Sequence, residues 1–121
     1  MYKIGMDIVE INRIKESIDK HKDQFLNRVF TSSELEYSRG KAGEAAHLAA
    51  RFCGKEAVMK ALSVPVDFKD IEIISGPEGA PFVKLHGRAC ELAGKNNVKN
   101  IQISLSHCKE YAAASVILEA G

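Results

Sequence analysis

A long helix is the element that most constrains how this chain can fold. The stretch from Glu44 to about Leu62 contains no proline and is rich in alanine, which has the highest intrinsic helix propensity. On a helical wheel, one side of this stretch carries only small side chains, those of Ala46, Ala50, Cys53, Gly54, Ala57 and Ala61. Glycine in mid-helix costs about 1 kcal/mol relative to alanine, and a close approach to another element would offset that cost. We therefore expect the helix to pack very closely against a sheet or a second helix.

The other half of the wheel is charged and carries Arg51, Lys55, Glu56 and Lys60. Because Glu56 and Lys60 are one turn apart, they point the same way, and we expect them to lie on one charged ridge. A carboxylate beside an ammonium suits a metal ion next to a phosphate. The same spacing is also that of an ordinary surface ion pair, which contributes little to stability. The helix by itself does not decide between these interpretations.

The chain begins with a predicted strand that runs into an amphipathic helix. From residue 2 to residue 9, apolar side chains alternate with small or polar ones, the period of two expected of a strand. Asp7 should therefore lie on the face opposite the apolar one. Ile11, Ile14 and Ile18 then recur at helical spacing, with charged residues between them. The polar face of this helix is available to a partner.

The remaining segments predict an α+β domain with antiparallel hairpins. Hydroxyl and acidic side chains from Thr31 to Glu34 are typical of a helix start, here of a short helix near residues 35–39. The pattern then predicts a hairpin of strands 71–74 and 81–85, a short helix over 87–94, and two antiparallel strands over 101–107 and 111–118. Neither an internal repeat nor a linker is evident, so we expect a single domain over residues 1–121.

Composition and charge exclude several classes of protein. Hydrophobic residues make up 45% of the chain and no tract is of low complexity, so an ordered domain is expected rather than a disordered one. A net charge of +1 excludes the strong positive field that nucleic-acid binding normally shows. No apolar run approaches the roughly 20 residues that span a membrane, and no secretory signal is apparent. We expect a cytoplasmic protein that binds neither membranes nor nucleic acids and whose cysteines are free thiols.

Two further residues could take part in chemistry, although neither is specific by itself. His107 ends a predicted strand in the segment Ser104–His107, where a histidine can simply hydrogen-bond a turn carbonyl. Asp7 lies near the end of the first strand, where a carboxylate can cap the following helix because the helix dipole favours negative charge. Neither residue alone indicates a functional site.

In combination, however, these residues resemble the pattern of the holo-[acyl-carrier-protein] synthases, the small bacterial 4′-phosphopantetheinyl transferases. The matching segments follow the family's order along the chain: Gly5–Ile11, Arg28–Thr31 with Glu34, Arg51–Phe52, Lys55–Ala57, Lys60–Leu62, Gly79–Pro81, Ser104–His107 and Tyr111–Ala112. The resemblance implies the 4′-phosphopantetheinyl transferase fold, in which an antiparallel sheet packs with a long central helix. It also implies a homotrimer with active sites between neighbouring subunits.

The resemblance further implies an activity. The 4′-phosphopantetheine moiety of coenzyme A would be transferred to a serine of apo-acyl carrier protein. The products would be holo-acyl carrier protein, which supports fatty acid biosynthesis, and adenosine 3′,5′-bisphosphate. Breaking the pyrophosphate of coenzyme A is phosphoryl transfer, in which positioning and charge neutralisation supply most of the catalysis.

The same resemblance implies a role for each candidate residue. Asp7 and Glu56 would bind Mg²⁺, which typically takes one or two carboxylates together with water and substrate phosphate. Glu56 and Lys60 would be catalytic, with Lys60 at the charge that develops on the reacting phosphates. Arg51, Lys60 and His107 would bind coenzyme A, and Arg51 could meet its 3′-phosphate or another anionic group. The acceptor of the serine proton stays open between Glu56 and a metal-bound water.

Local charge suggests where a protein partner could bind. Between Asn12 and Arg28, positive side chains outnumber negative ones, although the net charge of the chain is small. By resemblance, Arg13 and the neighbouring basic residues of the first helix would dock the acidic recognition helix of acyl carrier protein.

Two other functions use the same residues. One is a non-catalytic module that holds acyl carrier protein or coenzyme A. The other is a magnesium-dependent phosphohydrolase of small nucleotides, in which water replaces the serine as nucleophile. An assay with coenzyme A and an apo-carrier protein separates the three functions.

Overall fold

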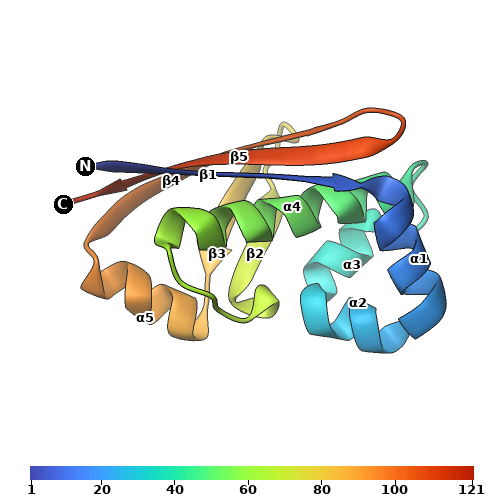
Figure 1. The fold of residues 1–121 in the computed structure, drawn as a ribbon, viewed down its shortest axis with the longest axis horizontal. Helices are drawn as coiled ribbons and strands as arrows, with labels where there is room; N and C mark the ends of the chain where they lie inside the picture. The colour runs from blue at the N-terminus through green and yellow to red at the C-terminus, as the bar shows by residue number, and fades with distance from the viewer.

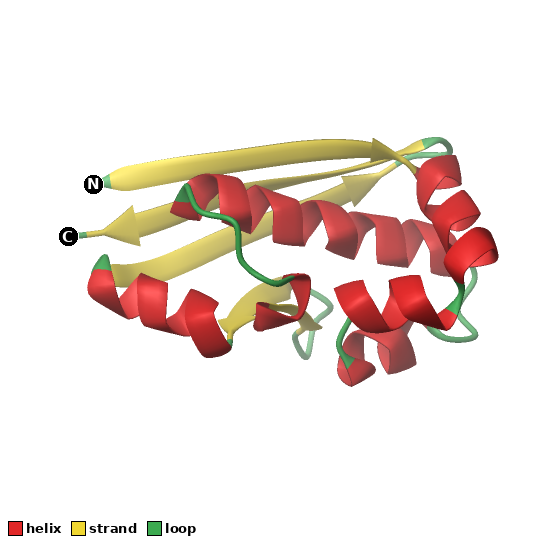
Figure 2. Ribbon diagram, turned by 60° about the horizontal axis from the view of Figure 1, so that its bottom comes forward, coloured by secondary structure: helices red, strands yellow, loops and turns green.

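The computed structural model describes all residues from Met1 to Gly121. Its elements in chain order are β1 (Tyr2–Glu10), α1 (Ile11–His21), α2 (Asp23–Val29), α3 (Ser32–Ser38), α4 (Glu44–Leu62), the 3₁₀ helix η1 (Phe68–Asp70), β2 (Ile71–Ser75), β3 (Pro81–Leu85), α5 (Gly87–Lys95), β4 (Val98–His107) and β5 (Tyr111–Ala120). Three strands form an antiparallel sheet in the order β1-β5-β4, and β2 and β3 form a separate hairpin. The sheet runs along one side of α4, while α1, α2 and α3 gather at one end of the molecule and α5 lies near the other (Figures 1 and 2).

Most of the predicted elements are confirmed. Helix α4 has the predicted bounds, and both predicted antiparallel pairs, β2 with β3 and β4 with β5, are present. Helix α3 begins at Ser32, earlier than predicted, because Thr31 and Glu34 form its capping box. Helix α2 and the long-range pairing of β1 with β5 were not predicted. None of the helices combines the length and the apolar character that a membrane span requires.

Helix α4 packs on the sheet with little side-chain volume between the two backbones. The predicted stripe of small residues is buried over most of its length. On the sheet side, the approach is closest at Gly5, where a Cβ atom would lie 1.9 Å from the carbonyl oxygen of Ala57. At Gly54, a Cβ would meet only side-chain ends, the nearest being Cδ1 of Ile103 at 3.1 Å. The missing Cβ of Gly5 therefore sets how close β1 lies to the helix, and it brings Asp7, two residues further along the same face, beside α4.

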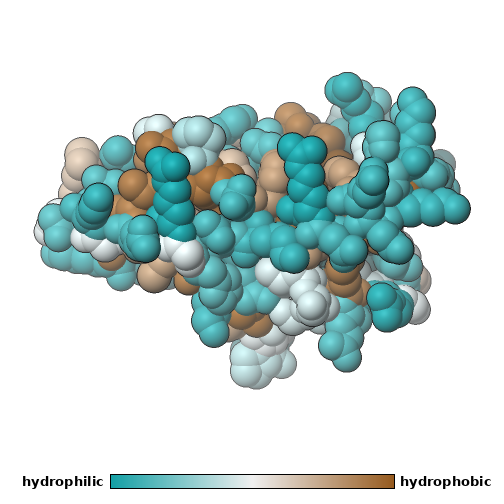
Figure 3. All heavy atoms as spheres, turned by 90° about the horizontal axis from the view of Figure 1, so that it is seen from below, coloured by the Kyte–Doolittle hydropathy of each residue, from teal (hydrophilic) through white to brown (hydrophobic).

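The outer face of the sheet carries exposed apolar side chains. Four of them belong to β1 and are between 63% and 76% exposed, namely Tyr2, Ile4, Met6 and Ile8. The predicted alternation in β1 is therefore present, but its apolar side points away from α4, because only the side with Gly5 fits against the helix backbone. No other element of the chain covers this face (Figure 1), whereas the side of the molecule seen from below is mainly hydrophilic (Figure 3). An apolar patch of this kind indicates a surface that another molecule covers.

A buried ion pair ties α4 to its neighbours. The ammonium of Lys55 lies 2.7 Å from Oε1 of Glu34, and both side chains are almost completely buried. Lys55 also donates to the carbonyl oxygens of Phe68, at 3.0 Å, and Ile71, at 2.6 Å. Glu34 accepts in addition from the backbone N–H of Ile73, at 2.8 Å. One pair of side chains thus connects α4 with α3, η1 and β2.

The charged half of α4 divides by burial. Arg51 and Lys55 are buried, at 4% and 0% exposed, whereas Glu56 is half-buried and Lys60 is exposed. A helical wheel gives the direction of each side chain, but not which other elements cover that direction. Arg51 and Lys55 are therefore shielded from solvent, whereas Glu56 is partly open to it and Lys60 is exposed.

Candidate active site

Asp7 and Lys60 form an ion pair where β1 runs beside α4, and Glu56 lies near enough to feel the charge of both. The ammonium of Lys60 lies 3.3 Å from Oδ1 of Asp7 and donates to the carbonyl oxygen of Met6 at 2.9 Å. It forms no ion pair with Glu56, so the surface pair considered from the sequence is not the one observed. The Asp7 side chain is 19% exposed and that of Lys60 is 55% exposed. We call Asp7, Glu56 and Lys60 the carboxylate cluster; it is open to solvent on the Lys60 side.

Burial and charge shift the pKa values in the carboxylate cluster. Burial raises the pKa of Glu56, and the negative charge of Asp7 raises it further, while Lys60 acts in the opposite direction. Burial, followed by Asp7, also raises the pKa of the neighbouring Cys53 to about 12. The Cys53 thiol donates to the carbonyl oxygen of Ala112 at 3.4 Å. Cys53 is therefore a neutral thiol near pH 7, and it does not serve as a nucleophile.

Asp7 and Glu56 offer the donor set of a hard cation. Burial and the charge of Asp7 raise the pKa of Glu56, and a divalent cation between the two carboxylates would relieve the repulsion between their negative charges. No group of three or more His, Cys, Asp or Glu side chains is arranged to hold a metal. An ion held by these two carboxylates would keep positions for water and ligand oxygens. The donors fit magnesium and do not fit a closed zinc site.

A second group, the cationic cluster, consists of Tyr37, Lys41, His47, Arg51 and His107. Lys41 Nζ lies 4.3 Å from the centroid of the Tyr37 ring, and the guanidinium carbon of Arg51 lies 4.5 Å from it. The His47 ring packs between the other two rings, with centroid distances of 6.0 Å to Tyr37 and 6.1 Å to His107. No carboxylate forms an ion pair with Lys41 or Arg51. Positive charge without a counter-ion suits an anionic group such as a phosphate.

Three members of the cationic cluster were missed from the sequence. His47 precedes Arg51 by four residues, so its place on the same face of α4 was available from helical periodicity. Tyr37 and Lys41 come from α3 and the following loop, and no local pattern places them against α4. Burial lowers the pKa of His47, and the charges of Arg51, His107 and Lys41 lower it further. Burial is the largest cause of this shift, and the positive charges of the cluster act in the same direction.

The two clusters face different sides of α4. Arg51 and Glu56 are five positions apart, and on a helix of 3.6 residues per turn their directions differ by about 140°. Arg51 turns toward α3 and β2, where it meets Tyr37 and Ser75. Glu56 and Lys60 turn toward β1. The structure therefore brings Asp7, Glu56 and Lys60 together, and it places Arg51 with His107 in a separate group.

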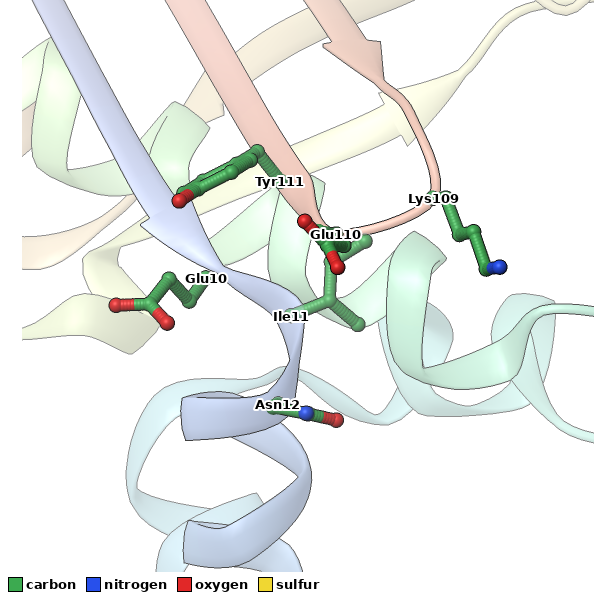
Figure 4. A pocket seen from close by; sticks show the side chains of 6 residues that line it. All are labelled: Glu10, Ile11, Asn12, Lys109, Glu110 and Tyr111. Atoms are coloured by element: carbon green, nitrogen blue, oxygen red, sulfur yellow. The ribbon is translucent and has the colours of Figure 1, made fainter.

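A pocket of about 170 Å³ lies at the end of the sheet where β1 passes into α1 (Figure 4). It is lined by Glu10, Ile11, Asn12, Lys109, Glu110 and Tyr111. The backbone N–H of Ile11 donates to the carbonyl oxygen of Glu110 at 2.8 Å, which joins the start of α1 to the turn between β4 and β5. Two carboxylates and one ammonium line the pocket, so it does not suit an anion. Neither cluster contributes to it.

Comparison with known proteins places the chain in a family. Residues 3–116 match the model of the 4′-phosphopantetheinyl transferase superfamily. The chain belongs to this superfamily. A holo-[acyl-carrier-protein] synthase of Caldicellulosiruptor bescii is 48% identical over 121 residues, with 98% of each chain covered. One of Dehalococcoides mccartyi is 44% identical, with 98% of this chain and 99% of the relative covered.

Solved structures give the same result for the fold. The crystal structure of Helicobacter pylori holo-[acyl-carrier-protein] synthase in complex with coenzyme A has a TM-score of 0.85 and 33% identity. The alignment covers 96% of this chain and 99% of that chain. The resemblance to the holo-[acyl-carrier-protein] synthases and the predicted α+β fold, an antiparallel sheet on a long central helix, are therefore confirmed.

In this phosphopantetheinyl transferase, Arg13 is exposed on α1, as the amphipathic pattern predicted. The helix has Ile14 buried and its charged residues outside. The roles of Asp7, Glu56, Lys60, Arg51, His107 and Arg13 in binding and catalysis stay predictions. The structure places five of these residues in the carboxylate cluster and the cationic cluster, whereas Arg13 lies apart from both on α1.

Proposed function

We propose that the protein transfers the 4′-phosphopantetheine moiety of coenzyme A to a serine of apo-acyl carrier protein and releases adenosine 3′,5′-bisphosphate. The convergence of Asp7, Glu56 and Lys60 beside β1 carries this proposal. The relatives described above support it, among them a synthase bound to coenzyme A. We place the reaction in the cytoplasm, where its product would serve fatty acid biosynthesis; the unpaired state of all three cysteines is compatible with a reducing compartment.

The carboxylate cluster would supply the reacting end of the site. Asp7 and Glu56 would hold Mg²⁺, which neutralises pyrophosphate charge when it is bound. The ammonium of Lys60 contacts only Asp7 and a backbone carbonyl, so it is free to turn to a phosphate oxygen as charge develops there. The serine proton would pass to Glu56 or to a water molecule beside it. Cys53 cannot accept this proton, because its thiol is already protonated.

The cationic cluster would supply the nucleotide end. Arg51 has no carboxylate partner and is suited to the 3′-phosphate of coenzyme A, while His107 would hydrogen-bond the phosphate or nucleotide part. Arg13, on the exposed side of α1, would meet the acidic recognition helix of the carrier protein. Substrate and carrier would thus approach through different surfaces.

We further propose that the complete active site forms between protomers of a homotrimer. Two observations support this. The two clusters face different sides of α4, so neighbouring copies could bring them together around one coenzyme A. The apolar outer face of β1 has no partner within the chain, and subunit interfaces bury faces of this kind.

A transfer assay tests the proposed function. With magnesium, coenzyme A and an apo-carrier protein, the carrier should gain the mass of one phosphopantetheine group. Asp7→Asn and Glu56→Gln should each lower the initial rate at least about 100-fold, because each removes negative charge from the magnesium site. Glu91→Gln, which changes an exposed carboxylate on α5, should leave the rate unchanged. A chelator should stop the reaction, and added magnesium should restore it.

Other outcomes of that assay point to the alternatives. Phosphate release without a carrier would favour the phosphohydrolase. Binding of coenzyme A with no turnover on several apo-carriers would favour the non-catalytic module. Either result would refute the transferase proposal.

Mixing two weak variants tests the shared site. Glu56→Gln disables the carboxylate cluster and Arg51→Met disables the cationic cluster, and each variant alone should be almost inactive at limiting coenzyme A. In trimers of random composition, about a quarter of the interfaces combine one intact cluster of each kind, so about a quarter of the wild-type activity should return. The wild type should have three times the 13.3 kDa mass of one chain by light scattering. A monomer, or mixed trimers without recovery, would contradict the shared site.

A further inference from the structure

The ring of Tyr37 has two positive charges over it. Lys41 Nζ lies 4.3 Å and the guanidinium carbon of Arg51 lies 4.5 Å from the ring centroid. Neither cation forms an ion pair with a carboxylate. In the isolated chain, both cations therefore lie against the negative π surface of the Tyr37 ring.

Arg51 has the surroundings of a group that awaits an anion. Its side chain is buried, and Nη2 donates to Oγ of Ser75 at 2.8 Å. Its buried Nε has no hydrogen-bond partner. A buried guanidinium with an unused donor and no counter-ion is costly, and a bound anion would remove that cost. Hydrogen bonding to Ser75 lowers the pKa of Tyr37, and the charges of Lys41 and Arg51 lower it further against the opposing effect of burial.

Tyr37 also begins a row of three rings that come from α3, α4 and β4. Its ring meets that of His47 at an interplanar angle of 88°, and His47 in turn meets His107 at 60°. A change at Tyr37 therefore acts directly on the two cations, and it acts on His107 through His47. The side chain of Tyr37 is itself partly exposed, so it can be changed without opening the core.

We propose that Tyr37 is a positioning residue of the coenzyme A site, where its ring holds Arg51 and Lys41 in the arrangement that binds the terminal 3′-phosphate. The ring touches no reacting atom and acts through the two cations. Without it, Lys41 would move freely on its exposed loop and Arg51 would lose the surface on which its guanidinium rests. The inference rests on the proposed function, since that function supplies the ligand.

Calorimetric titration with coenzyme A and with 3′-dephospho-coenzyme A tests this role independently of turnover. Tyr37→Leu should weaken coenzyme A binding about tenfold, because it removes the π surface under both cations. Tyr37→Phe keeps that surface and should bind within about threefold of the wild type. Dephospho-coenzyme A lacks the terminal phosphate, so both variants should bind it as the wild type does.

Lys41→Gln completes a double-mutant cycle. Alone, it should weaken coenzyme A binding about threefold, and in the Tyr37→Leu background it should add little, because the lysine is no longer held. If Tyr37→Leu lowers the melting temperature, the ratio of its affinities for coenzyme A and the dephospho form carries the test, because partial unfolding weakens both ligands equally and leaves that ratio unchanged.

Three results would separate the proposals. The role of Tyr37 would be overturned if Tyr37→Leu bound coenzyme A as tightly as the wild type does. It would also be overturned if the affinities for both ligands fell by the same factor. A wild type that binds coenzyme A but transfers nothing would refute the transferase, while the affinities would still decide on Tyr37. A wild type that binds no coenzyme A would refute both.

Discussion

Gly5→Ala is expected to lower the free energy of unfolding by about 3 kcal/mol or more, and to leave little folded protein if the wild type is marginally stable. The added Cβ would lie 1.9 Å from the carbonyl oxygen of Ala57 and 3.0 Å from the backbone nitrogen of Ala61. Both neighbours are helix backbone, which cannot move aside as a side chain can. Strand β1 would therefore have to separate from α4, and the apolar contacts between the two would be lost.

Urea unfolding at fixed protein concentration measures this effect, and Gly54→Ala is the matched control. The Cβ added at Gly54 would meet the ends of Ile103, Ile73 and Leu105 at 3.1 to 3.3 Å, and these side chains can shift by a few tenths of an ångström. Alanine also gains about 1 kcal/mol of helix propensity over glycine. We expect Gly54→Ala to change stability by no more than about 1 kcal/mol. A stable Gly5→Ala protein would show that α4 and β1 are not in backbone contact.

The same substitution has a consequence for the candidate site. Asp7 follows Gly5 by two residues on the same face of β1, so a displaced strand would move its carboxylate away from Glu56 and Lys60. Any Gly5→Ala protein that still folds should therefore lose most of its transferase activity. Gly5 allows β1 to lie close to α4, and this closeness places the Asp7 carboxylate beside Lys60.

Lys55→Met is expected to cost about 3–5 kcal/mol of stability, because it leaves the Glu34 carboxylate buried without its counter-ion. The removed ammonium also leaves the carbonyl oxygens of Phe68 and Ile71 without the donor that they now share. Burial lowers the pKa of Lys55, whereas the charge of Glu34 raises it, so the carboxylate is what keeps this ammonium charged in the core.

The double variant Lys55→Met with Glu34→Gln should cost clearly less than the sum of the two single variants, by at least about 1 kcal/mol, because no unpaired charge remains buried. Lys60→Met is the matched control on the same helix. Its ion pair with Asp7 is exposed, so we expect a stability change within about 1 kcal/mol. Urea unfolding of the four variants measures these differences, and additive single effects would show that Lys55 and Glu34 do not interact.

Local pattern was sufficient for much of the fold. The proline-free alanine stretch predicted α4 with its bounds, and period-two alternation predicted the strands, because both depend only on backbone geometry over a few residues. The order of short segments along the chain predicted the family, which the comparisons confirm. The resemblance to that family also implied that Asp7, Glu56 and Lys60 act at one site, and the structure brings the three residues close together.

Other features depended on which surfaces meet, and local periodicity carries no information about that. It did not reveal that the apolar side of β1 faces outward, because the cause lies in the backbone contact between Gly5 and Ala57. It grouped Lys55 with Lys60. In the structure, Lys55 is buried in an ion pair with Glu34, which is far away in sequence, whereas Lys60 lies in solvent. It also missed Tyr37 beneath Arg51. The sequence by itself determined most of the elements, the family and the chemical groups. The tertiary structure decided which charges are buried, which face is left without a partner and which side chains meet, because long-range contacts set burial and pairing.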